Sequence, residues 1–447
     1  MRKYNTYLEY RSWENNWIRE LPESWQIVPL KYLCTNFVKD GPHETPKFLD
    51  SGIPFLSVDG IQDNKLVFEG CRYISREDHK RYSMKCLPKK GDVLLGKAAS
   101  VGKVAYVDTD MSFNVWSPLA VITAKSNHLG RYIYYCLQSK MLQAQCEVFS
   151  NSNTQKNLGM STIDNLDFPY PSEFEAKCIA KFLDHETAKI DTLIAKQQQL
   201  IKLLKEKRQA VISHAVTKGL KPDTPMKDSG VEWLGEVPEH WVVTRAKYVS
   251  NIFVPQRNKP ELNDTHGIAW ATMEDMKQQY ISDTSKYVSS ESALAAGSKK
   301  LKAGSVIASC VGNFGVTSIN KIDVIINQQL QAFQPINIKA EYLQSIVALS
   351  KQYFELIGTA ATLVYVNQEG FENLPILMPP EKEQNEICEY VLGKSTSFDL
   401  LIEKSVIQTS LLKERRTALI SAAVTGKIDV RNWQAPVNQD AQQQEAG

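Results

Sequence analysis

The chain has 447 residues, of which 43% are apolar and 9% aromatic, and its formal net charge is +2. This length is sufficient for two or three domains, each with its own core. No stretch approaches the roughly eighteen consecutive apolar residues of a membrane span, and the N-terminus, MRKYNTYLEYRSW, lacks the apolar core of a signal peptide. The composition therefore excludes a membrane protein and indicates a globular protein of the cytoplasm.

The eight cysteines also exclude a common type of metal site. They form no CxxC pair, and no histidine stands near them at the spacing of zinc ligands. We expect reduced, mostly buried thiols and no bound metal.

The N-terminal part of the chain contains the first half of an internal repeat. Residues 1–16 are polar and aromatic without a period. The segment Trp17–Leu33, WIRELPESWQIVPLKYL, then returns 216 residues later as Trp233–Val249, WLGEVPEHWVVTRAKYV, with Trp25 aligned to Trp241. We call these two stretches the Trp-Pro-Trp segments. A repeat of this length means that one structural unit is used twice.

A body of about 135 residues follows each Trp-Pro-Trp segment, and we expect it to mix strands and helices. Amphipathic patterns predict helices over 132–148 and 341–357. Spaced matches, such as Gly52 with Gly267 and Asn114 with Asn327, indicate one fold, although most other side chains differ between the bodies. Short β-branched runs bounded by Gly, Pro, Asn or Asp predict strands at 104–107, 119–123, 306–307 and 324–326.

Positive charge is concentrated in two segments. Residues 72–103 contain nine Lys or Arg against three acids, and residues 177–221 contain ten against four. Local fields of this sign suit a polyanion such as nucleic acid. Solvated lysines on a helix surface explain the second segment better than the first.

Each repeat ends in a long helical segment. Leu193–Gly219, LIAKQQQLIKLLKEKRQAVISHAVTKG, has a near copy 208 residues later at Leu401–Lys427, LIEKSVIQTSLLKERRTALISAAVTGK. No Pro or Gly interrupts 175–217, which predicts a helix of roughly 65 Å. One apolar stripe on so long a helix requires a partner, and its own copy gives an intramolecular coiled coil. The alternative is a solvated surface helix. The two expected stripes include Ile190, Leu193, Ile194, Leu200, Ile201, Leu204, Val211 and Ala215, and Phe398, Leu401, Ile402, Leu412, Leu419 and Ala423.

These features predict seven consecutive segments. They are an N-terminal extension (1–16), a first body with its Trp-Pro-Trp segment (17–170), a central long helix (171–218), a linker rich in Gly and Pro (219–232), a second body with its Trp-Pro-Trp segment (233–378), a C-terminal long helix (379–427) and a disordered tail (428–447).

No motif predicts catalysis. The run Gly91–Lys97, GDVLLGK, has the spacing of a phosphate-binding loop, but Ala98 follows in place of the magnesium-binding Ser or Thr, and the second repeat has Ser309 and Cys310 at the corresponding positions. Motifs of a methyltransferase, a nuclease or an activated nucleophile are also missing from the sequence. We therefore expect a binding protein without a cofactor of its own.

The candidate binding residues lie on turns and in the basic segments. The stretch Asp40–Lys47 forms turns with polar and cationic tips, while Lys and Arg suit phosphates and amides suit adenine edges. Each residue alone is better explained as a solvated surface side chain, so the prediction rests on the set. In the first repeat the set is Lys39, His43, Thr45, Lys47, Arg72, Arg76, Lys80, Arg81, Lys85, Lys89, Lys90, Lys97, Ser100, Lys103, Asn151, Asn153, Gln155 and Lys156. In the second it is Gln256, Arg257, Lys259, Lys299, Lys300, Asn313, Gln328, Gln329 and Asn367.

Taken together, the two Pro-Glu-x-Trp motifs, the two different bodies and the two helices ending LLKExR…AxISxAVT resemble the DNA-specificity subunit of type I restriction-modification systems. The run Asp40–Ser57, DGPHETPKF…SGIPFLS, also resembles an opening of that family's target-recognition domains. The resemblance covers the chain apart from its termini. It implies an α+β protein in which two mixed α/β target-recognition domains are joined by two long helices in an antiparallel coiled coil, related by a pseudo-two-fold axis.

The resemblance also implies a function and partners. Each body would read one half of an asymmetric, split site in double-stranded DNA. Two methyltransferase subunits would dock on the helices and restriction subunits would join them, while S-adenosylmethionine and ATP would bind to those partners. A stand-alone enzyme and a scaffold or RNA-binding coiled-coil protein remain the alternatives. Residues expected in the coiled coil and in subunit docking are Ile190, Ile194, Ile201, Leu204, Arg208, Val211, Phe398, Leu401, Leu412, Arg416 and Leu419.

Overall fold

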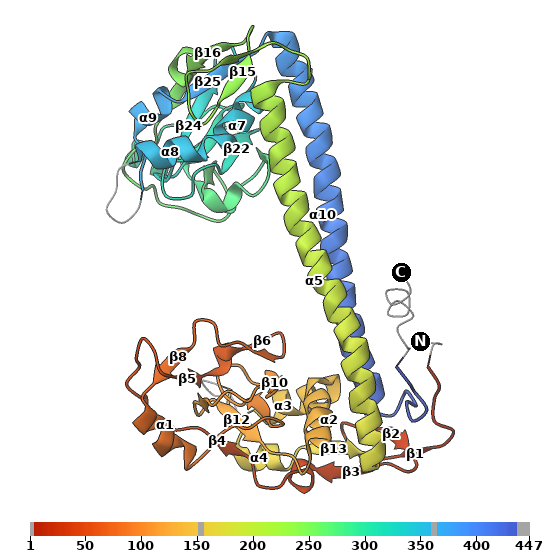
Figure 1. Cartoon of the computed structure of the whole chain (residues 1–447). Coiled ribbons are helices and arrows are strands. Elements are labelled where there is room, and N and C mark those ends of the chain that lie inside the picture. The colour runs from red at the N-terminus through yellow and green to blue at the C-terminus, as the bar shows by residue number, and fades with distance from the viewer. Residues whose placement is uncertain (1–3, 151–155, 359–363, 436–447) are drawn as a thin grey trace. The chain divides into compact units, whose positions relative to one another are not determined.

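The computed structural model describes residues 4–150, 156–358 and 364–435, which divide into two compact units. Unit 1 comprises 1–198 and 406–447, and unit 2 comprises 199–405. Both boundaries lie inside long helices, α5 (Glu173–Lys218) and α10 (Glu381–Val424), so that each unit contains one half of each helix (Figure 1). The expectation of two mixed α/β bodies joined by two long helices is confirmed.

The body of unit 1 is built on two sheets. A four-stranded antiparallel sheet has the order β10-β9-β12-β4, and a mixed three-stranded sheet has the order β11-β5-β8. The pair β3·β13 joins the Trp-Pro-Trp segment to the strand before α5, while β1·β2 and β6·β7 are short antiparallel pairs. The strands are β1 (Tyr10–Ser12), β2 (Glu20–Pro22), β3 (Gln26–Pro29), β4 (Lys39–Asp40), β5 (Ile53–Leu56), β6 (Ile61–Gln62), β7 (Lys65–Leu66), β8 (Arg72–Ile74), β9 (Val93–Gly96), β10 (Val104–Tyr106), β11 (Asn114–Val115), β12 (Leu119–Ile122) and β13 (Asp167–Tyr170).

Unit 2 repeats this arrangement. Its sheet β17-β24-β21-β22 matches β4-β12-β9-β10 in order and direction and gains β19 beside β22, and its sheet β20-β18-β23 matches β8-β5-β11. The pair β16·β25 corresponds to β3·β13, and β14·β15 to β1·β2. The strands are β14 (Met226–Asp228), β15 (Glu236–Pro238), β16 (Val242–Arg245), β17 (Ser250–Phe253), β18 (Ile268–Ala271), β19 (Tyr280–Ile281), β20 (Tyr287–Val288), β21 (Val306–Ser309), β22 (Thr317–Asn320), β23 (Val324–Ile326), β24 (Leu330–Pro335) and β25 (Pro375–Met378).

The helices of the two bodies also correspond. In each body, however, the structure has two consecutive helices where the sequence predicted one. The single helix expected over 132–148 is α2 (Asn127–Gln138) followed by α3 (Lys140–Phe149), and the one expected over 341–357 is α7 (Ala340–Leu349) followed by α8 (Lys351–Ile357). Each break lies at a fully buried serine. Ser139 Oγ donates to the Cys136 carbonyl and accepts from the Leu142 amide, and Ser350 Oγ donates to the Ile346 carbonyl. A serine that bonds its own backbone competes with a continuous helix. The remaining short helices are α1 (Arg76–Ser83), α4 (Met160–Asp164), α6 (Ser290–Ala295) and α9 (Gln368–Glu372).

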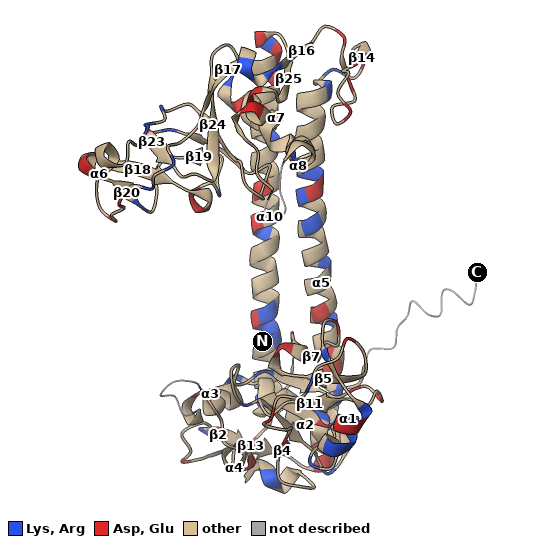
Figure 2. Cartoon of the chain, turned by 90° about the vertical axis from the view of Figure 1, so that its left-hand side faces the viewer, with Lys and Arg blue, Asp and Glu red and all other residues tan. Residues whose placement is uncertain are grey.

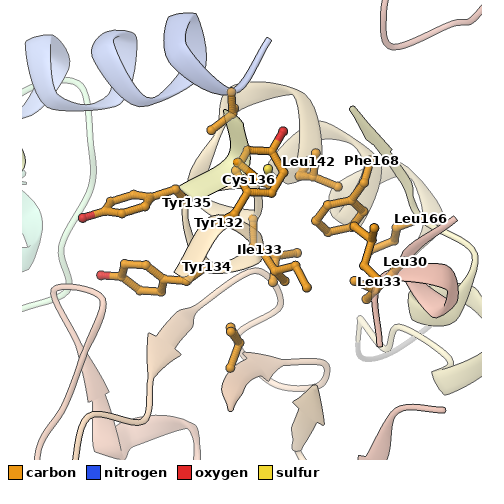
Figure 3. Close-up of a cluster of buried hydrophobic side chains, with 14 of the residues drawn as sticks. Leu30, Leu33, Tyr132, Ile133, Tyr134, Tyr135, Cys136, Leu142, Leu166 and Phe168 are labelled. Atoms are coloured by element: carbon orange, nitrogen blue, oxygen red, sulfur yellow. The ribbon is translucent and has the colours of Figure 1, made fainter. Parts of the chain in front are cut away.

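The main core of unit 1 forms around α2. Tyr132 and Cys136 are fully buried, and α2 packs toward Phe168 of β13 and Leu30 of the Trp-Pro-Trp segment (Figure 3). The Tyr132 hydroxyl donates to the Pro169 carbonyl at 2.7 Å, which satisfies the one polar group that this side chain buries. Tyr342 of α7 is the counterpart in unit 2 and donates to the carbonyl of Val216 at 3.1 Å. The buried tyrosine thus ties α2 to strand β13 in unit 1 and α7 to the C-terminal part of α5 in unit 2.

Two expectations about single positions need correction. Residues 428–435 were expected to belong to a disordered tail, but Val430 is 1% exposed in the core of unit 1 and the amide of Asp429 donates to the carbonyl of Asn5 at 2.8 Å. The match of Asn114 with Asn327 is two residues out of register, since Asn114 pairs with Phe55 in β5, whereas Asn327 follows the end of β23. Residues 436–447 lie outside the described ranges.

Candidate nucleic-acid interface

The loop after β4 is held in place by a buried carboxylate. Asp40 is 1% exposed, with its Oδ1 2.7 Å from Lys85 Nζ and its Oδ2 3.2 Å from Lys97 Nζ. Burial alone would raise the pKa of Asp40, but the hydrogen bonds and charges of Lys85 and Lys97 outweigh it and hold the pKa below its ordinary value. Lys85 Nζ also donates to the carbonyl of Gly41 at 2.7 Å, so the start of the loop is tied down at two adjacent residues.

Gly41 allows the loop to pass close to a neighbouring strand. A Cβ at this position would lie 1.7 Å from the carbonyl oxygen of Val115, a distance that no side chain tolerates. Beyond this anchor, His43, Thr45 and Lys47 are exposed, as a recognition loop requires. The loop therefore combines a rigid base with accessible tips.

Lys97 was expected to face DNA, and the structure places it differently. Its side chain is 9% exposed, and its ammonium faces Asp40. In unit 2 the strand register places Val254 and Cys310 at the positions of Asp40 and Lys97. The same sheet is thus built once around an ion pair and once without it.

The other cations of the basic segment 72–103 are exposed, but some of them are already paired. Arg81 lies 2.8 Å from Glu44 and 2.9 Å from Asp78, and Lys90 lies 2.7 Å from Asp110. Figure 2 shows Lys, Arg, Asp and Glu interleaved on α1. Among the described residues, the following members of the predicted set are exposed and make no salt bridge: Lys39, Lys47, Arg72, Arg76, Lys80, Lys89 and Lys103.

The remaining candidates of the first repeat fall into two groups. Ser100 is partly exposed, and Lys156 is exposed and ion-paired with Glu147. Asn151, Asn153 and Gln155 lie outside the described residues.

In unit 2 the structure brings several predicted residues together. Gln256 donates to Ser298 Oγ at 3.0 Å and accepts from the Lys299 amide at 3.1 Å, while Gln328 donates to the carbonyls of Gln256 and Arg257 at 3.4 and 3.3 Å. Three loops that are far apart in sequence therefore meet at Gln256. By the strand register, Gln256 follows the counterpart of Asp40 by two residues, so this junction corresponds to the start of the unit 1 loop, where Lys85 bonds Asp40 and Gly41.

Five further candidates of unit 2 have separate surroundings. Lys259, Asn313 and Gln329 are exposed, and Lys300 lies 3.9 Å from Asp323. Asn367 caps α9, because its Oδ1 accepts from the Gly370 amide at 3.0 Å, a helix-capping role that the sequence analysis did not foresee.

Aromatic residues were missed in the sequence analysis. The guanidinium of Arg72 lies 4.7 Å from the ring centre of Phe48 and 5.9 Å from that of Trp116, and Phe55 packs between these rings at 6.1 and 6.3 Å. These residues come from three separate segments, so no spacing in the sequence connects them.

The long helices pack against each other with heptad spacing. In unit 1 Asp191 of α5 pairs with Arg416 of α10 at 2.9 Å, and in unit 2 Arg208 of α5 lies 3.3 Å from Asp399 of α10. The two arginines and the two aspartates are each 208 residues apart, so the repeat makes the same cross-helix pair twice. The less exposed positions follow alternating steps of four and three, as in a coiled coil: Ile190, Ile194, Gln197, Ile201, Leu204, Arg208, Val211 and Ala215 on α5, and Phe398, Ile402, Ser405, Thr409, Leu412, Arg416 and Leu419 on α10.

Leu401 does not belong to this stripe. It is 48% exposed, and Ile402 takes the inward position; Leu193 and Leu200, also expected in the stripe, are 48% and 42% exposed. Each of these leucines lies one residue before an inward position, namely Ile194, Ile201 or Ile402, and polar Gln197, Ser405 and Thr409 occupy other inward positions.

Two features limit the kinds of site that the described residues form. No helix among them is long and apolar enough to cross a membrane. No group of three or more His, Cys, Asp or Glu side chains in the described ranges is arranged to hold a metal ion, and the eight cysteines are unpaired.

The fold and the candidate residues define a duplicated α+β protein with a different polar surface on each copy and a shared helical frame. A sequence model of the family described as "Type I restriction modification DNA specificity domain" matches residues 22–203 and again residues 238–395. The chain belongs to this family and contains its domain twice. It is thus a non-catalytic, DNA-recognising specificity subunit of the type I restriction-modification kind.

Individual relatives match more than nine-tenths of the chain. The type I restriction enzyme MjaIX specificity subunit of Methanocaldococcus jannaschii is 24% identical, over 92% of this chain and 95% of its own length. The StySPI specificity subunit of Salmonella potsdam is 20% identical, over 93% and 91%. A solved chain from work on complex assembly and conformational transition of a type I R-M system has a TM-score of 0.68 at 16% identity, covering 91% of this chain and 99% of that one, which supports the fold.

Proposed function

We propose that this chain reads an asymmetric, bipartite site in double-stranded DNA and directs adenine methylation and restriction to it. Each body reads one half-site, and the long helices dock two methyltransferase subunits, which restriction subunits join. S-adenosylmethionine and ATP bind to those partners, and the complex works in the cytoplasm.

The observation that carries this proposal is that the two units share their strands, helices and cross-helix ion pair but differ in the loops at their surfaces. Both units share strand order, helix order and the cross-helix Asp–Arg pair. The loop junctions differ, with Lys85 and Asp40 in unit 1 and Ser298 and Gln256 in unit 2. Because sequence is read by side chains that reach base edges, two different sets of loops on one frame imply two different half-sites.

Exposed leucines on the helices support docking of two equivalent partners. Leu193 and Leu411 belong to unit 1 and are 48% and 57% exposed, and their repeat counterparts Leu401 and Leu203 belong to unit 2 and are 48% and 52% exposed. Each unit thus presents the same pair of apolar side chains. Exposed apolar surface on both copies of a repeat fits two copies of one partner.

The first test is mapping of N6-methyladenine in host DNA with the gene intact and with the gene deleted. We expect methylation at one split, asymmetric motif to disappear on deletion. If the pattern of an active methyltransferase does not depend on this gene, or if the purified chain binds DNA and RNA of any sequence equally, the proposal is wrong.

Exchange of parts separates the roles of bodies and helices. Replacing residues 34–170 with another body should change one half-site and leave the other intact. Deleting two heptads from both helices, seven residues on either side of each unit boundary, should shorten the unread gap and preserve both half-sites. Altered half-sites with an unchanged gap would contradict the assignment of the helices as spacer.

A further inference from the structure

Among the described residues of unit 1, Arg72 is the predicted DNA contact whose guanidinium has ring contacts and no hydrogen-bond or ion-pair partner. It opens β8 and pairs in register with Phe55 of β5, so its backbone is fixed by the sheet. Its guanidinium lies over Phe48 and near Trp116, at 4.7 and 5.9 Å from the ring centres. The backbone of Trp116 is held by the sheet, because its amide donates to the Leu56 carbonyl at 2.8 Å. Cation–π contact with these rings restricts the side chain without using any N–H donor.

Other arginines that lie over rings in the described residues already use their donors. Arg81, Arg131 and Arg431 form ion pairs with carboxylates, and Arg11 donates to the Trp25 carbonyl at 3.4 Å. Within the same ranges no hydrogen bond or salt bridge is formed by the Arg72 side chain, which is exposed. Its five N–H groups are therefore oriented and available.

The surroundings of Arg72 favour a base edge over a phosphate. A pocket of about 230 Å³ lies beside it, lined also by Trp116, Asp59, Glu69 and Cys71. Two carboxylates at the same pocket repel a phosphate, but they can accept a hydrogen bond from the N4 amine of cytosine. A planar guanidinium matches O6 and N7 of guanine, and the adjacent acceptors suit the cytosine paired with it.

Unit 2 lacks this arrangement. The pairing of β18 with β20 places Lys286 where Arg72 stands, and Asn263, Leu262 and Asn327 take the places of Leu49, Phe48 and Trp116. The Lys286 ammonium is ion-paired with Asp264. The platform is therefore specific to the first body, as expected of a device that distinguishes the two half-sites.

We propose that Arg72, stacked on Phe48 and Trp116, reads a guanine of one G·C pair in the half-site of the first body. This inference rests on the proposed function and specifies one base pair of the half-site that the first body reads. Phe48 and Trp116 are positioning residues, since they act through the guanidinium of Arg72.

The test uses the full chain, co-produced with its methyltransferase subunits, and maps methylated motifs for wild type, Arg72→Lys and Phe48→Ala. Arg72→Lys keeps the charge and loses the planar fork. We expect the preference for G·C at one position of one half-site to fall about 5- to 150-fold, with the second half-site unchanged as an internal check of folding. Phe48→Ala should relax the same position less strongly. Lys286→Ala is the matched control and should leave that position unchanged.

The outcomes separate the two levels of the argument. Absence of any gene-dependent motif in wild type refutes the proposed function itself. A wild-type motif without a G·C pair in the half-site of the first body, or one whose G·C preference survives Arg72→Lys, overturns the role of Arg72. DNA binding by a further variant, Arg72→Ala, tests the phosphate alternative. If this variant binds all sequences more weakly by the same factor, with the salt dependence reduced by about one ion, Arg72 contacts a phosphate and its role in base reading is overturned.

Discussion

The ion pair of Asp40 and Lys97 offers a sharp test of how the recognition loop is held, because unit 2 contains the alternative solution. The change is to give unit 1 the residues of unit 2: Asp40→Val, Lys97→Cys and the double variant. Lys97→Cys leaves a buried carboxylate next to Lys85 at 2.7 Å and His43 Nε2 at 3.4 Å, and Asp40→Val leaves the buried ammonium of Lys97 without its carboxylate. Breaking a fully buried pair costs about 3–5 kcal/mol. Since Lys85 remains at 2.7 Å, we expect about 2–3 kcal/mol for Lys97→Cys.

The double variant should be milder than the sum of the single variants. Replacing both members of a buried pair by apolar groups is often nearly neutral, and unit 2 is built with Val254 and Cys310 at these positions. We expect the double variant to lie within about 1 kcal/mol of wild type, which corresponds to a coupling of at least about 2 kcal/mol.

Hydrogen exchange measures the stability of each unit separately, whereas melting of the whole chain does not separate the two units. The free energy of opening should be measured on peptides that contain β9 and β12, with peptides that contain β21 as a control that must not change. Each 1.4 kcal/mol corresponds to about tenfold in the exchange rate. Additive effects of the two single changes, or a harmless Lys97→Cys, would refute the idea that this pair is a buried unit.

The pH dependence follows from the same geometry. The pKa of Asp40 is lower in the folded chain than in the unfolded one, so the pair contributes stability above the unfolded pKa and loses it as the pH falls through the folded pKa. Below about pH 4, protection of β9 should therefore fall more steeply in wild type than in the double variant. Equal slopes would show that Asp40 contributes nothing to acid sensitivity.

Three further predictions concern other parts of the chain. Arg416→Ala should destabilise unit 1 by about 2 kcal/mol, because the side chain is 13% exposed and bonds both Asp191 and Gln138. Its counterpart Arg208→Ala should destabilise unit 2 by less than about 1 kcal/mol, because that side chain is 37% exposed. Urea-dependent hydrogen exchange measures both losses, and a larger loss for Arg208→Ala than for Arg416→Ala would contradict the prediction. Cys71 is partly exposed in the pocket beside Arg72, while burial raises the pKa of Cys86 to about 11, so iodoacetamide should label Cys71 first and a duplex with the cognate site should slow that labelling; an unchanged rate would place the DNA elsewhere. Gly52→Ala and Gly267→Ala should each cost about 1–3 kcal/mol, because the φ values are 154° and 119° and a Cβ would lie 2.5 and 2.2 Å from a carbonyl oxygen; unchanged hydrogen exchange in the unit that carries the substitution would contradict this.

The frame was predictable from the sequence because its signals are local or repeated. Each long helix begins two residues after its predicted start; α5 ends at the predicted residue 218 and α10 three residues before the predicted 427. The strands at 104–107, 119–123 and 324–326 are present. Glycines at corresponding positions, such as Gly52 and Gly267, matched because both need a backbone conformation that other residues resist. Periodicity and repetition do not depend on knowing which distant segments meet.

The predicted binding residues were harder to rank, because exposure and pairing depend on contacts between distant segments. Lys97 looked the same in sequence as Lys89, but a carboxylate that is 57 residues away holds it in the interior. Arg72 looked like another surface cation, yet its rings come from Phe48 and Trp116. Counting charges gives the sign of a surface, whereas the partners of each charge decide which ones are available.

The N-terminal arm shows how the repeat is completed with different chain connections. In unit 2, β14 comes from the linker after α5 and pairs with β15, whereas in unit 1 its counterpart β1 comes from the N-terminus and pairs with β2. Tyr7 of this arm is 6% exposed, and its hydroxyl donates to Glu175 of α5 at 2.6 Å. Residues without any sequence period are thus ordered by distant contacts, because Tyr7 packs in the core of unit 1 and β1 pairs with β2. Backbone groups of a lone strand are unpaired, so a partner strand and a buried side chain, rather than any pattern in residues 4–12, account for the order of this arm.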